Sequence, residues 1–351
     1  MTILDDLDSM KSNDPDDMLG HIGDLPNQIK TAWATIASFE PPVAYREVRN
    51  VTISGMGGSA IGGSLVQALA EPECPIPIAV NRDYDLPGYV DENTLVIASS
   101  YSGNTEETLS ALDQALNAGA KIIALTTNGK LAKIAADQGF PTVSFDYDAQ
   151  PRAALGYSFT LLLGIFVKLS LLGDQTSNIN EAIDTLRRMQ TTIGEDIPSE
   201  RNPAKDLAIQ STGKTPTIYG AGIMKPVAQR WKGQFNENAK TWAAFDEMPE
   251  LNHNSVVGYE GPEHLKDSAF VVMLQSSIEG ERIHQRFDVT ASLLSQARIS
   301  HAVVKAWGES PLTQMLSAIH LGDYVSYYRA AINGVDPTPI PSIDHLKQEL
   351  G

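Results

Sequence analysis

Three hydroxyl side chains follow an apolar run within a few residues of one another. Residues 95–99 read Leu-Val-Ile-Ala-Ser, and Ser100, Ser102 and Thr105 come next, with Gly103 among them. The apolar run predicts a buried strand, and the residues after Thr105 predict a helix. Hydroxyls donate hydrogen bonds without adding bulk, and helix N-termini attract anions. The stretch predicts a cradle for a small dianion, above all a phosphate monoester; the alternative is a turn that only caps the helix.

A glycine-rich stretch earlier in the chain offers a second hydroxyl. Residues 50–54 predict a strand, residues 55–63 a glycine-rich turn that includes Ser59, and the residues from Ser64 onward a helix. The turn fits a loose dinucleotide fingerprint, Gly-x-Gly-x-x-Ala, with Asp83 or Asp85 near the end of the next strand. A pyrophosphate cradle does not need the Ser59 hydroxyl. Two hydroxyl-bearing loops favour a compact terminal phosphate over a nicotinamide cofactor.

These loops belong to an alternation of strands and helices. The predicted strands of the first half are residues 50–54, 76–81, 95–99, 121–126 and 142–145. The alternation predicts a doubly wound, mostly parallel α/β sheet with its ligand loops at the C-terminal ends of the strands.

The second half repeats the first. Residues 217–222 echo residues 52–57, and residues 269–277 echo the strand that leads to Ser100. In the repeat, residues 276–280 replace the hydroxyl-rich loop and include Glu279, which would repel a dianion. We therefore expect a duplicated α/β unit with one phosphate cradle per chain, in the first copy.

Composition restricts the class of ligand. The 351 residues are 42% hydrophobic, enough for two domains, and carry a formal net charge of −17. Such a chain repels nucleic acid and anionic membranes, so we expect neither as a partner. The single cysteine, Cys74, fits a reducing compartment, and the acidic N-terminus shows no secretory signal, so a cytoplasmic location is expected. Residues 159–172 are the most apolar segment, shorter than a membrane span, and predict a buried helix.

The two loops together resemble the sugar-isomerase (SIS) domain. More narrowly, the chain resembles the bifunctional phosphoglucose/phosphomannose isomerases of bacteria and archaea. The stretches that carry the resemblance run in the expected order: residues 57–59, 100–108, 234–240, 251–254, 322–326 and 336–347. One departure is Ser255, which stands where the family's Asn-His-Asn-Glu motif has its glutamate.

The resemblance implies a division of the chain and an assembly. The expected parts are an N-terminal helical arm (1–45), a first, phosphate-binding SIS domain (46–175), a linker helix (176–200), a second SIS domain (201–335) and a C-terminal tail and helix (336–351). It also implies a homodimer in which the active site is completed across the interface.

Two residues fit the proton chemistry of an aldose–ketose isomerase. Glu237, which lies after the second glycine-rich turn between two amides, fits the base that moves a proton between adjacent carbons. Without the resemblance it would be an ordinary solvated carboxylate. His253 fits the group that opens the sugar ring, because imidazole titrates near neutral pH. The resemblance implies that this histidine reaches the active site of the neighbouring subunit.

Two cations and five cradle residues complete the expected site. Lys347, in a C-terminal helix, could assist at the ring oxygen, and Arg152, before an apolar helix, fits the cation that stabilises the enediolate. Each would otherwise be an ordinary surface charge. The residues expected to hold the phosphate are Gly58, Ser59, Ser100, Ser102 and Thr105. Because these are uncharged, Arg152 and Lys347 are the expected source of local positive charge.

Neither a metal nor a cofactor is expected. The seven histidines form no His-x-His or His-x-x-x-His pair, and one cysteine cannot build a thiolate site. The sequence therefore predicts metal-free proton transfer through a cis-enediol, interconverting glucose 6-phosphate or mannose 6-phosphate with fructose 6-phosphate. The alternatives are an SIS-type protein that binds a phosphosugar without turnover and an SIS isomerase of another sugar phosphate. Glu237 and His253 distinguish an isomerase from a protein that only binds a phosphosugar, since such a protein needs neither residue.

Overall fold

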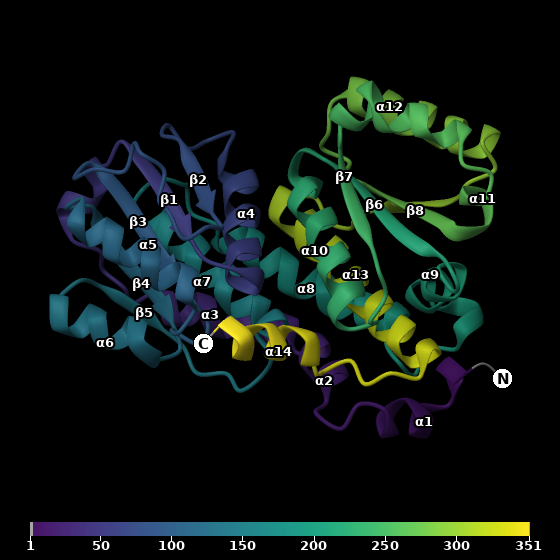
Figure 1. Cartoon of the computed structure of the whole chain (residues 1–351), viewed down its shortest axis with the longest axis horizontal. Coiled ribbons are helices and arrows are strands. Elements are labelled where there is room, and N and C mark those ends of the chain that lie inside the picture. The colour runs from purple at the N-terminus through teal and green to yellow at the C-terminus, as the bar shows by residue number, and fades with distance from the viewer. Residues whose placement is uncertain (1–2, 351) are drawn as a thin grey trace. The chain divides into compact units, whose positions relative to one another are not determined.

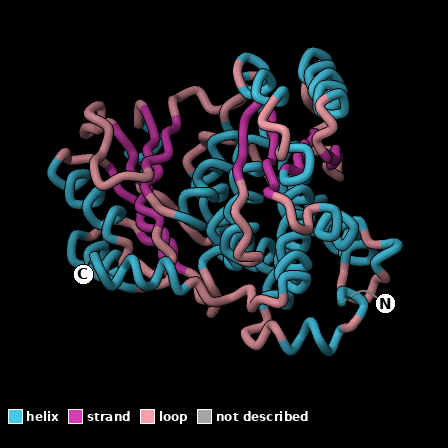
Figure 2. Tube along the Cα trace, turned by 45° about the vertical axis from the view of Figure 1, so that its right-hand side comes forward, coloured by secondary structure: helices cyan, strands magenta, loops and turns pink. Residues whose placement is uncertain are grey.

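The computed structural model describes residues 3–350, which fall into two compact units. One unit spans Asp24–Asp184 and contains a five-stranded sheet; the other joins the residues up to Gly23 with those from Thr185 onward and contains a four-stranded sheet. Figure 2 shows the two sets of strands as separate magenta groups. The boundary between the units falls within one helix, α8 (Thr176–Ile193).

The five-stranded unit is a parallel sheet of order β2-β1-β3-β4-β5. Its strands are β1 (Asn50–Ser54), β2 (Ile78–Asn81), β3 (Thr94–Ser99), β4 (Lys121–Thr126) and β5 (Thr142–Ser144). Its helices are α3 (Leu25–Ile36), α4 (Gly57–Ala70), α5 (Glu106–Asn117), α6 (Gly129–Gln138) and α7 (Leu155–Lys168) (Figure 1). All five predicted strands are confirmed. Because β1 and β3 are neighbours, the two predicted ligand loops leave the same edge of the sheet side by side.

Side-chain alternation fixes the two faces of this sheet. Val96 and Ala98 of β3 pack with Leu112 of α5 and Leu131 of α6 in one hydrophobic cluster. The residues between them, such as Ile97, point to the opposite face and are also fully buried. Burial on both faces explains why the strands read as continuous apolar runs.

Helix α4 begins earlier than the sequence predicts. The expected helix started at Ser64 after a long glycine-rich turn, but the structure is helical from Gly57. Within that turn, Gly57 has a positive φ of +48°. Gly63 lies inside the helix, and a Cβ there would be 3.0 Å from Cγ2 of Ile53 on β1. Glycines that looked like a flexible turn instead let a helix pack closely on the sheet.

The four-stranded unit repeats this topology, with the parallel order β7-β6-β8-β9. Its strands are β6 (Thr215–Ala221), β7 (Ala244–Met248), β8 (Ala269–Gln275) and β9 (Ser300–Lys305). Its helices are α1 (Leu7–Ser12), α2 (Met18–Gly23), α9 (Pro203–Gln210), α10 (Lys225–Glu237), α11 (Leu265–Ser268), α12 (Glu281–Gln296), α13 (Pro311–Asn333) and α14 (Pro341–Leu350). The predicted fold class is confirmed: two doubly wound α/β domains, with N-terminal helices and a C-terminal helix.

The helices before the first strand are shared between the units. Helix α2 contacts α13, whereas α3 packs along α7. The apolar segment 159–172 was predicted to be a buried helix; the buried helix α7 covers it up to Lys168 and begins earlier, at Leu155. Within residues 3–350, none of the helices combines the length and the apolar character needed to cross a bilayer.

Candidate active site

The loop after β3 is held rigid by its own hydrogen bonds. The hydroxyls of Ser100 and Thr105 lie 2.8 Å apart, and Ser100 is buried. Thr105 occupies the N-cap position of α5, yet its side chain accepts no hydrogen bond from the helix. Its hydroxyl therefore serves the loop rather than the helix cap, which argues against the capping alternative at this residue. Ser102 is exposed and accepts a hydrogen bond from the backbone N–H of Asn104.

A glycine makes this loop possible. Gly103 has φ +65°, and a Cβ there would lie 1.8 Å from the carbonyl oxygen of Asn128. The loop is also tied to the start of α6, because the backbone N–H of Leu131 donates to the Gly103 carbonyl over 2.9 Å. A side chain at this position would therefore displace the hydroxyls from the cradle.

The turn between β1 and α4 lies against the end of β3. A Cβ at Gly55 would be 2.7 Å from the carbonyl oxygen of Ser99 and 3.3 Å from Cβ of Ser59. Ser59, which is buried, is thus brought to the same edge as the Ser100 loop. Both α4 and α5 begin here without a side-chain cap from their N-cap residues. Their first N–H groups add donors to the cradle.

Arg152 is a buried cation on an element that contacts helix α4. It lies in the short 3₁₀ helix η3 (Pro151–Ala154), with 4% of its surface exposed. The η3 backbone touches the glycine-rich turn, since a Cβ at Gly58 would be 2.9 Å from the carbonyl oxygen of Pro151. The structure therefore gathers the expected phosphate-side residues at one edge of the five-stranded sheet: Gly58, Ser59, Ser100, Ser102, Thr105 and Arg152.

Two positioning residues near Arg152 were not expected from the sequence. The Tyr101 hydroxyl contacts the carbonyl of Tyr147 and accepts from the backbone N–H of Ala149, just before η3. Burial raises the pKa of Tyr101, so its phenol stays neutral. Gln28 of α3 donates to the carbonyl of Ala153 over 2.9 Å. Tyr101 lies within the recognised motif, but nothing in the sequence around Gln28 indicates this contact.

The second copy of the cradle is closed by protein side chains. Gly222 has φ +48°, the same as Gly57, but a Cβ there would lie 2.1 Å from a carboxylate oxygen of Glu279, whereas a Cβ at Gly57 would meet no atom within 4 Å. Ser276 donates to Oε1 of Gln314, whose amide nitrogen in turn donates to the Ser277 hydroxyl, both over 2.7 Å. The space that is open in the first copy is filled in the second.

Glu237 ends helix α10 and lines a cavity of about 650 Å³ in the four-stranded unit. The other lining residues are Asn236, Lys240, Thr241, Trp242 and the segment 339–343. The ammonium group of Lys240 donates to the backbone carbonyls of Glu237 and Pro337. It thereby ties the end of α10 to the segment that leads into α14. Trp242, 83% exposed, forms an apolar wall that was not expected from the sequence.

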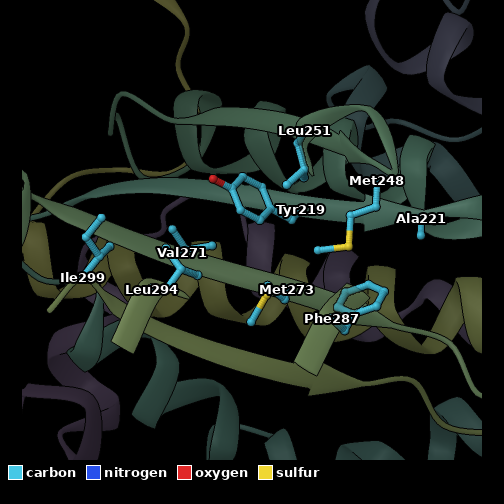
Figure 3. Close-up of a cluster of buried hydrophobic side chains, with 9 residues drawn as sticks. All are labelled: Tyr219, Ala221, Met248, Leu251, Val271, Met273, Phe287, Leu294 and Ile299. Carbon is cyan, nitrogen blue, oxygen red and sulfur yellow. The ribbon is translucent and has the colours of Figure 1, made fainter. Parts of the chain in front are cut away.

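His253 is exposed on a segment that is anchored on both sides. It ends the 3₁₀ helix η6 (Glu250–His253). Leu251, two residues earlier, is buried in the hydrophobic cluster that includes Tyr219 and Met248 (Figure 3). Asn252 donates to the hydroxyl of Thr290 over 2.9 Å. An exposed imidazole on an anchored segment suits a group that must reach a ligand.

Ser255, the departure from the family motif, is bonded to a carboxylate. Its hydroxyl donates to Asp246 of β7. A carboxylate from another element, β7, therefore lies against the Ser255 hydroxyl.

Lys347 lies on α14, of which every residue is exposed. Glu237, His253 and Lys347 thus occupy three separate elements of the four-stranded unit, whereas the phosphate side is assembled on the five-stranded unit. Among residues 3–350, no group of three or more His, Cys, Asp or Glu side chains could hold a metal ion.

Two family models match this chain, one in each half. A family model described as SIS domain matches residues 45–150, and one described as bacterial phospho-glucose isomerase C-terminal SIS domain matches residues 200–350. A "Bifunctional phosphoglucose/phosphomannose isomerase" from Caldicellulosiruptor bescii is 44% identical over 95% of this chain and 98% of its own length. One of the same name from Aquifex aeolicus is 34% identical over 91% and 94%.

A solved structure supports the fold at lower sequence identity. A hypothetical protein from Thermus thermophilus superposes with a TM-score of 0.73 at 18% identity, covering 97% of this chain and 91% of its own. The two SIS matches and the 44% identity over nearly the full length of a curated relative lead to one assignment. The chain belongs to the family of bifunctional phosphoglucose/phosphomannose isomerases.

Proposed function

We propose that this protein is an aldose–ketose isomerase that interconverts glucose 6-phosphate, mannose 6-phosphate or both with fructose 6-phosphate. The observation that carries the proposal is the contrast between the two cradles. In the first, Gly57 faces open space at the edge that carries the hydroxyls; in the second, Glu279 fills the equivalent position. This contrast supports the first cradle as the one that receives a phosphate from solution.

The proposed chemistry moves one proton between adjacent carbons and one between their oxygens. The phosphate is held by Ser59, Ser100, Ser102, Thr105 and the Gly58 backbone. The Glu237 carboxylate removes the proton from C2 of the open-chain aldose and returns it to C1, while the O2 proton moves to O1, so that atoms and charge balance. Arg152 stabilises the enediolate oxygens, and His253 with Lys347 opens the ring. The support for Glu237 is its place in the cavity.

One enediol serves both hexoses. Glucose and mannose 6-phosphates differ only at C2, the carbon that becomes planar in the intermediate. An enzyme that returns the proton to either face of C2 acts on both sugars. The exposed Trp242 beside Glu237 offers a flat apolar surface compatible with either epimer.

The test is a coupled assay of both hexose 6-phosphates with Glu237→Gln, and with Glu260→Gln as control. Because Gln cannot accept the proton, turnover should fall by about 10³-fold while phosphosugar affinity is kept. Glu260 is an exposed carboxylate of the same unit, and its variant should behave as wild type. Substantial isomerisation by Glu237→Gln would remove Glu237 from its role. EDTA in the same assay should change nothing; loss of activity restored by zinc or manganese would refute the metal-free mechanism.

The same assay distinguishes the alternatives. Binding of the phosphosugar by the wild type without any turnover would assign an SIS-type binding protein. Turnover of an amino-sugar or pentose phosphate in preference to both hexose phosphates would assign a different SIS isomerase.

We also propose a homodimer whose active sites combine residues of both subunits. The support is the exposure of His253 on an anchored segment. If Glu237 and His253 serve one site from different subunits, mixing Glu237→Gln with His253→Ala restores activity, because each heterodimer holds one intact site. Random reassociation should then return about a quarter of wild-type activity. Two inactive variants that stay inactive after verified subunit exchange would rule out the shared site.

A further inference from the structure

A second cavity of the four-stranded unit lies between α12 and the segment that carries His253. Its volume is about 530 Å³. The lining residues are Asn252, Val256, Arg282, Gln285, Arg286, Val289, Thr290 and Leu293. None of these was given a role in the isomerase reaction.

Two arginines face this groove from one side of a helix. Arg282 and Arg286 are four residues apart, so their side chains are neighbours on the surface of α12. Like charges at this spacing destabilise a helix. Arg282 donates to Gln285 and Arg286 to Asn252, both neutral amides, and within residues 3–350 neither arginine forms an ion pair. The carboxylate of Glu281 accepts a hydrogen bond from Gln285. In a chain with a net charge of −17, two adjacent arginines without an ion pair in the described part of the chain are an unusual arrangement.

The spacing of the two arginines and the residues that line the groove indicate which kind of ligand would fit. Each guanidinium can hold one carboxylate with two parallel hydrogen bonds. Two of them, one helical turn apart, match two carboxylates separated by a short chain. Val289 and Leu293 continue the same face of α12, and Val256 faces them from the other wall. They offer an apolar surface to the carbons between the carboxylates.

The groove is connected to His253 by hydrogen bonds. Arg286 donates to Oδ1 of Asn252 over 3.2 Å, and Asn252 donates to Thr290. Asn252 directly precedes His253. A carboxylate that takes up Arg286 competes with Asn252 for the same guanidinium and loosens the anchor of the segment.

We propose that Arg282 and Arg286 form a binding site for a small aliphatic dicarboxylate, whose occupancy acts on His253 through Asn252. The first part stands on the groove alone. The second rests on the proposed role of His253 in ring opening. None of the residues that line the groove belongs to the phosphate cradle.

The binding test uses succinate as the probe in calorimetric titrations at low ionic strength. Wild type should bind succinate, and Arg282→Gln should weaken that binding about tenfold or more, since a charge-assisted pair is lost. Lys305→Gln removes an exposed positive charge elsewhere in the same unit and should bind as wild type. Equal affinity of wild type and Arg282→Gln, or no binding by either, would overturn the site.

A second arm separates this site from the cradle. Inorganic phosphate should lose affinity in Ser102→Ala and keep it in Arg282→Gln, and succinate should show the opposite pattern. Succinate affected only by Ser102→Ala would place it in the cradle and overturn the inference. Phosphate unaffected by Ser102→Ala would instead contradict the proposed function, so the two failures are distinguishable.

The coupling test measures isomerase kinetics with succinate. We expect succinate to lower kcat severalfold with little change in KM for wild type, and to have no effect on Arg282→Gln, whose basal activity should be normal. Competition with the substrate alone, or an equal effect on Arg282→Gln, would refute the coupling through Asn252.

Discussion

Ser100 and Ser276 occupy equivalent loops of the two halves but have different partners. Ser100 shares a hydrogen bond with Thr105 at an open cradle, whereas Ser276 is fully buried against Gln314. We propose that the same residue type serves a ligand in one copy, whereas in the other it makes an internal hydrogen bond. The pair forms a natural comparison for mutagenesis.

Replacing these serines by alanine should separate function from stability. Ser100→Ala removes a proposed phosphate ligand and should raise KM about tenfold, the equivalent of one charge-assisted hydrogen bond. Ser276→Ala should leave KM unchanged and lower the free energy of unfolding by about 1–3 kcal/mol, because it removes a buried hydrogen bond. Steady-state kinetics and urea unfolding measure the two effects. A higher KM in Ser276→Ala would show that the second cradle also receives substrate.

The residues proposed for the phosphate side carry a local signal in the sequence. Ser100, Ser102 and Thr105 lie within one short loop, and Ser59 lies in one turn. Gln28 and Gln314 were missed because they act across long sequence distances: Gln28 bonds to Ala153, 125 positions away. In the sequence, a helical glutamine that makes such a contact looks the same as one whose side chain is solvated.

Helix α3 connects the N-terminal segment to the candidate site. It packs along α7, and its Gln28 bonds to both Ala153 of η3 and the N–H of Gly156 at the start of α7. The sequence assigned no chemistry to this segment. In the structure it fixes the backbone on both sides of the link between η3 and α7, and so helps to place Arg152.

Gln28→Leu should therefore affect both stability and turnover. It leaves the buried Ala153 carbonyl and Gly156 N–H without this partner, which costs about 1–3 kcal/mol of unfolding free energy. If Arg152 shifts as a result, kcat should fall severalfold with little change in KM. Gln67→Leu is the control, since Gln67 also bonds a backbone carbonyl, that of Ile78. Equal kcat values for the two variants would show that Gln28 is purely structural.

The elements themselves were predicted well where the hydrophobic pattern is continuous, as in the five strands of the first sheet. The start of α4 was wrong because glycine has two opposite uses. It allows a left-handed turn, as at Gly57, and it allows close helix packing, as at Gly63. Composition alone does not distinguish these uses.

The stability of the whole chain should depend on a buried histidine. His320 of α13 is fully buried beside Tyr324, and no hydrogen bond to either ring nitrogen is found among the described residues. Burial lowers its pKa from 6.5 to about 3. Between these values the unfolded chain binds one more proton than the native chain at this position, so stability falls as the pH falls below 6.5.

The expected size of this effect can be measured. Between pH 7.5 and 5, His320 should account for a loss of roughly 2 kcal/mol in unfolding free energy. His320→Phe keeps an aromatic ring without the titration and should lose less stability over the same range. Urea unfolding at several pH values gives the comparison. Parallel pH profiles for wild type and His320→Phe would show that the imidazole does not titrate on unfolding.

The duplication was predictable from the sequence, but the position of Glu279 in the second cradle was not. Glu279 was expected to repel a dianion; the structure shows it lying over the left-handed glycine itself. The Glu279 carboxylate therefore occupies the place that a phosphate would take in the second copy. In a ligand titration each chain should consequently saturate with one equivalent of sugar phosphate. An inhibitor that carries a phosphate group should likewise bind at one site per chain, although the internal duplication offers two equivalent loops.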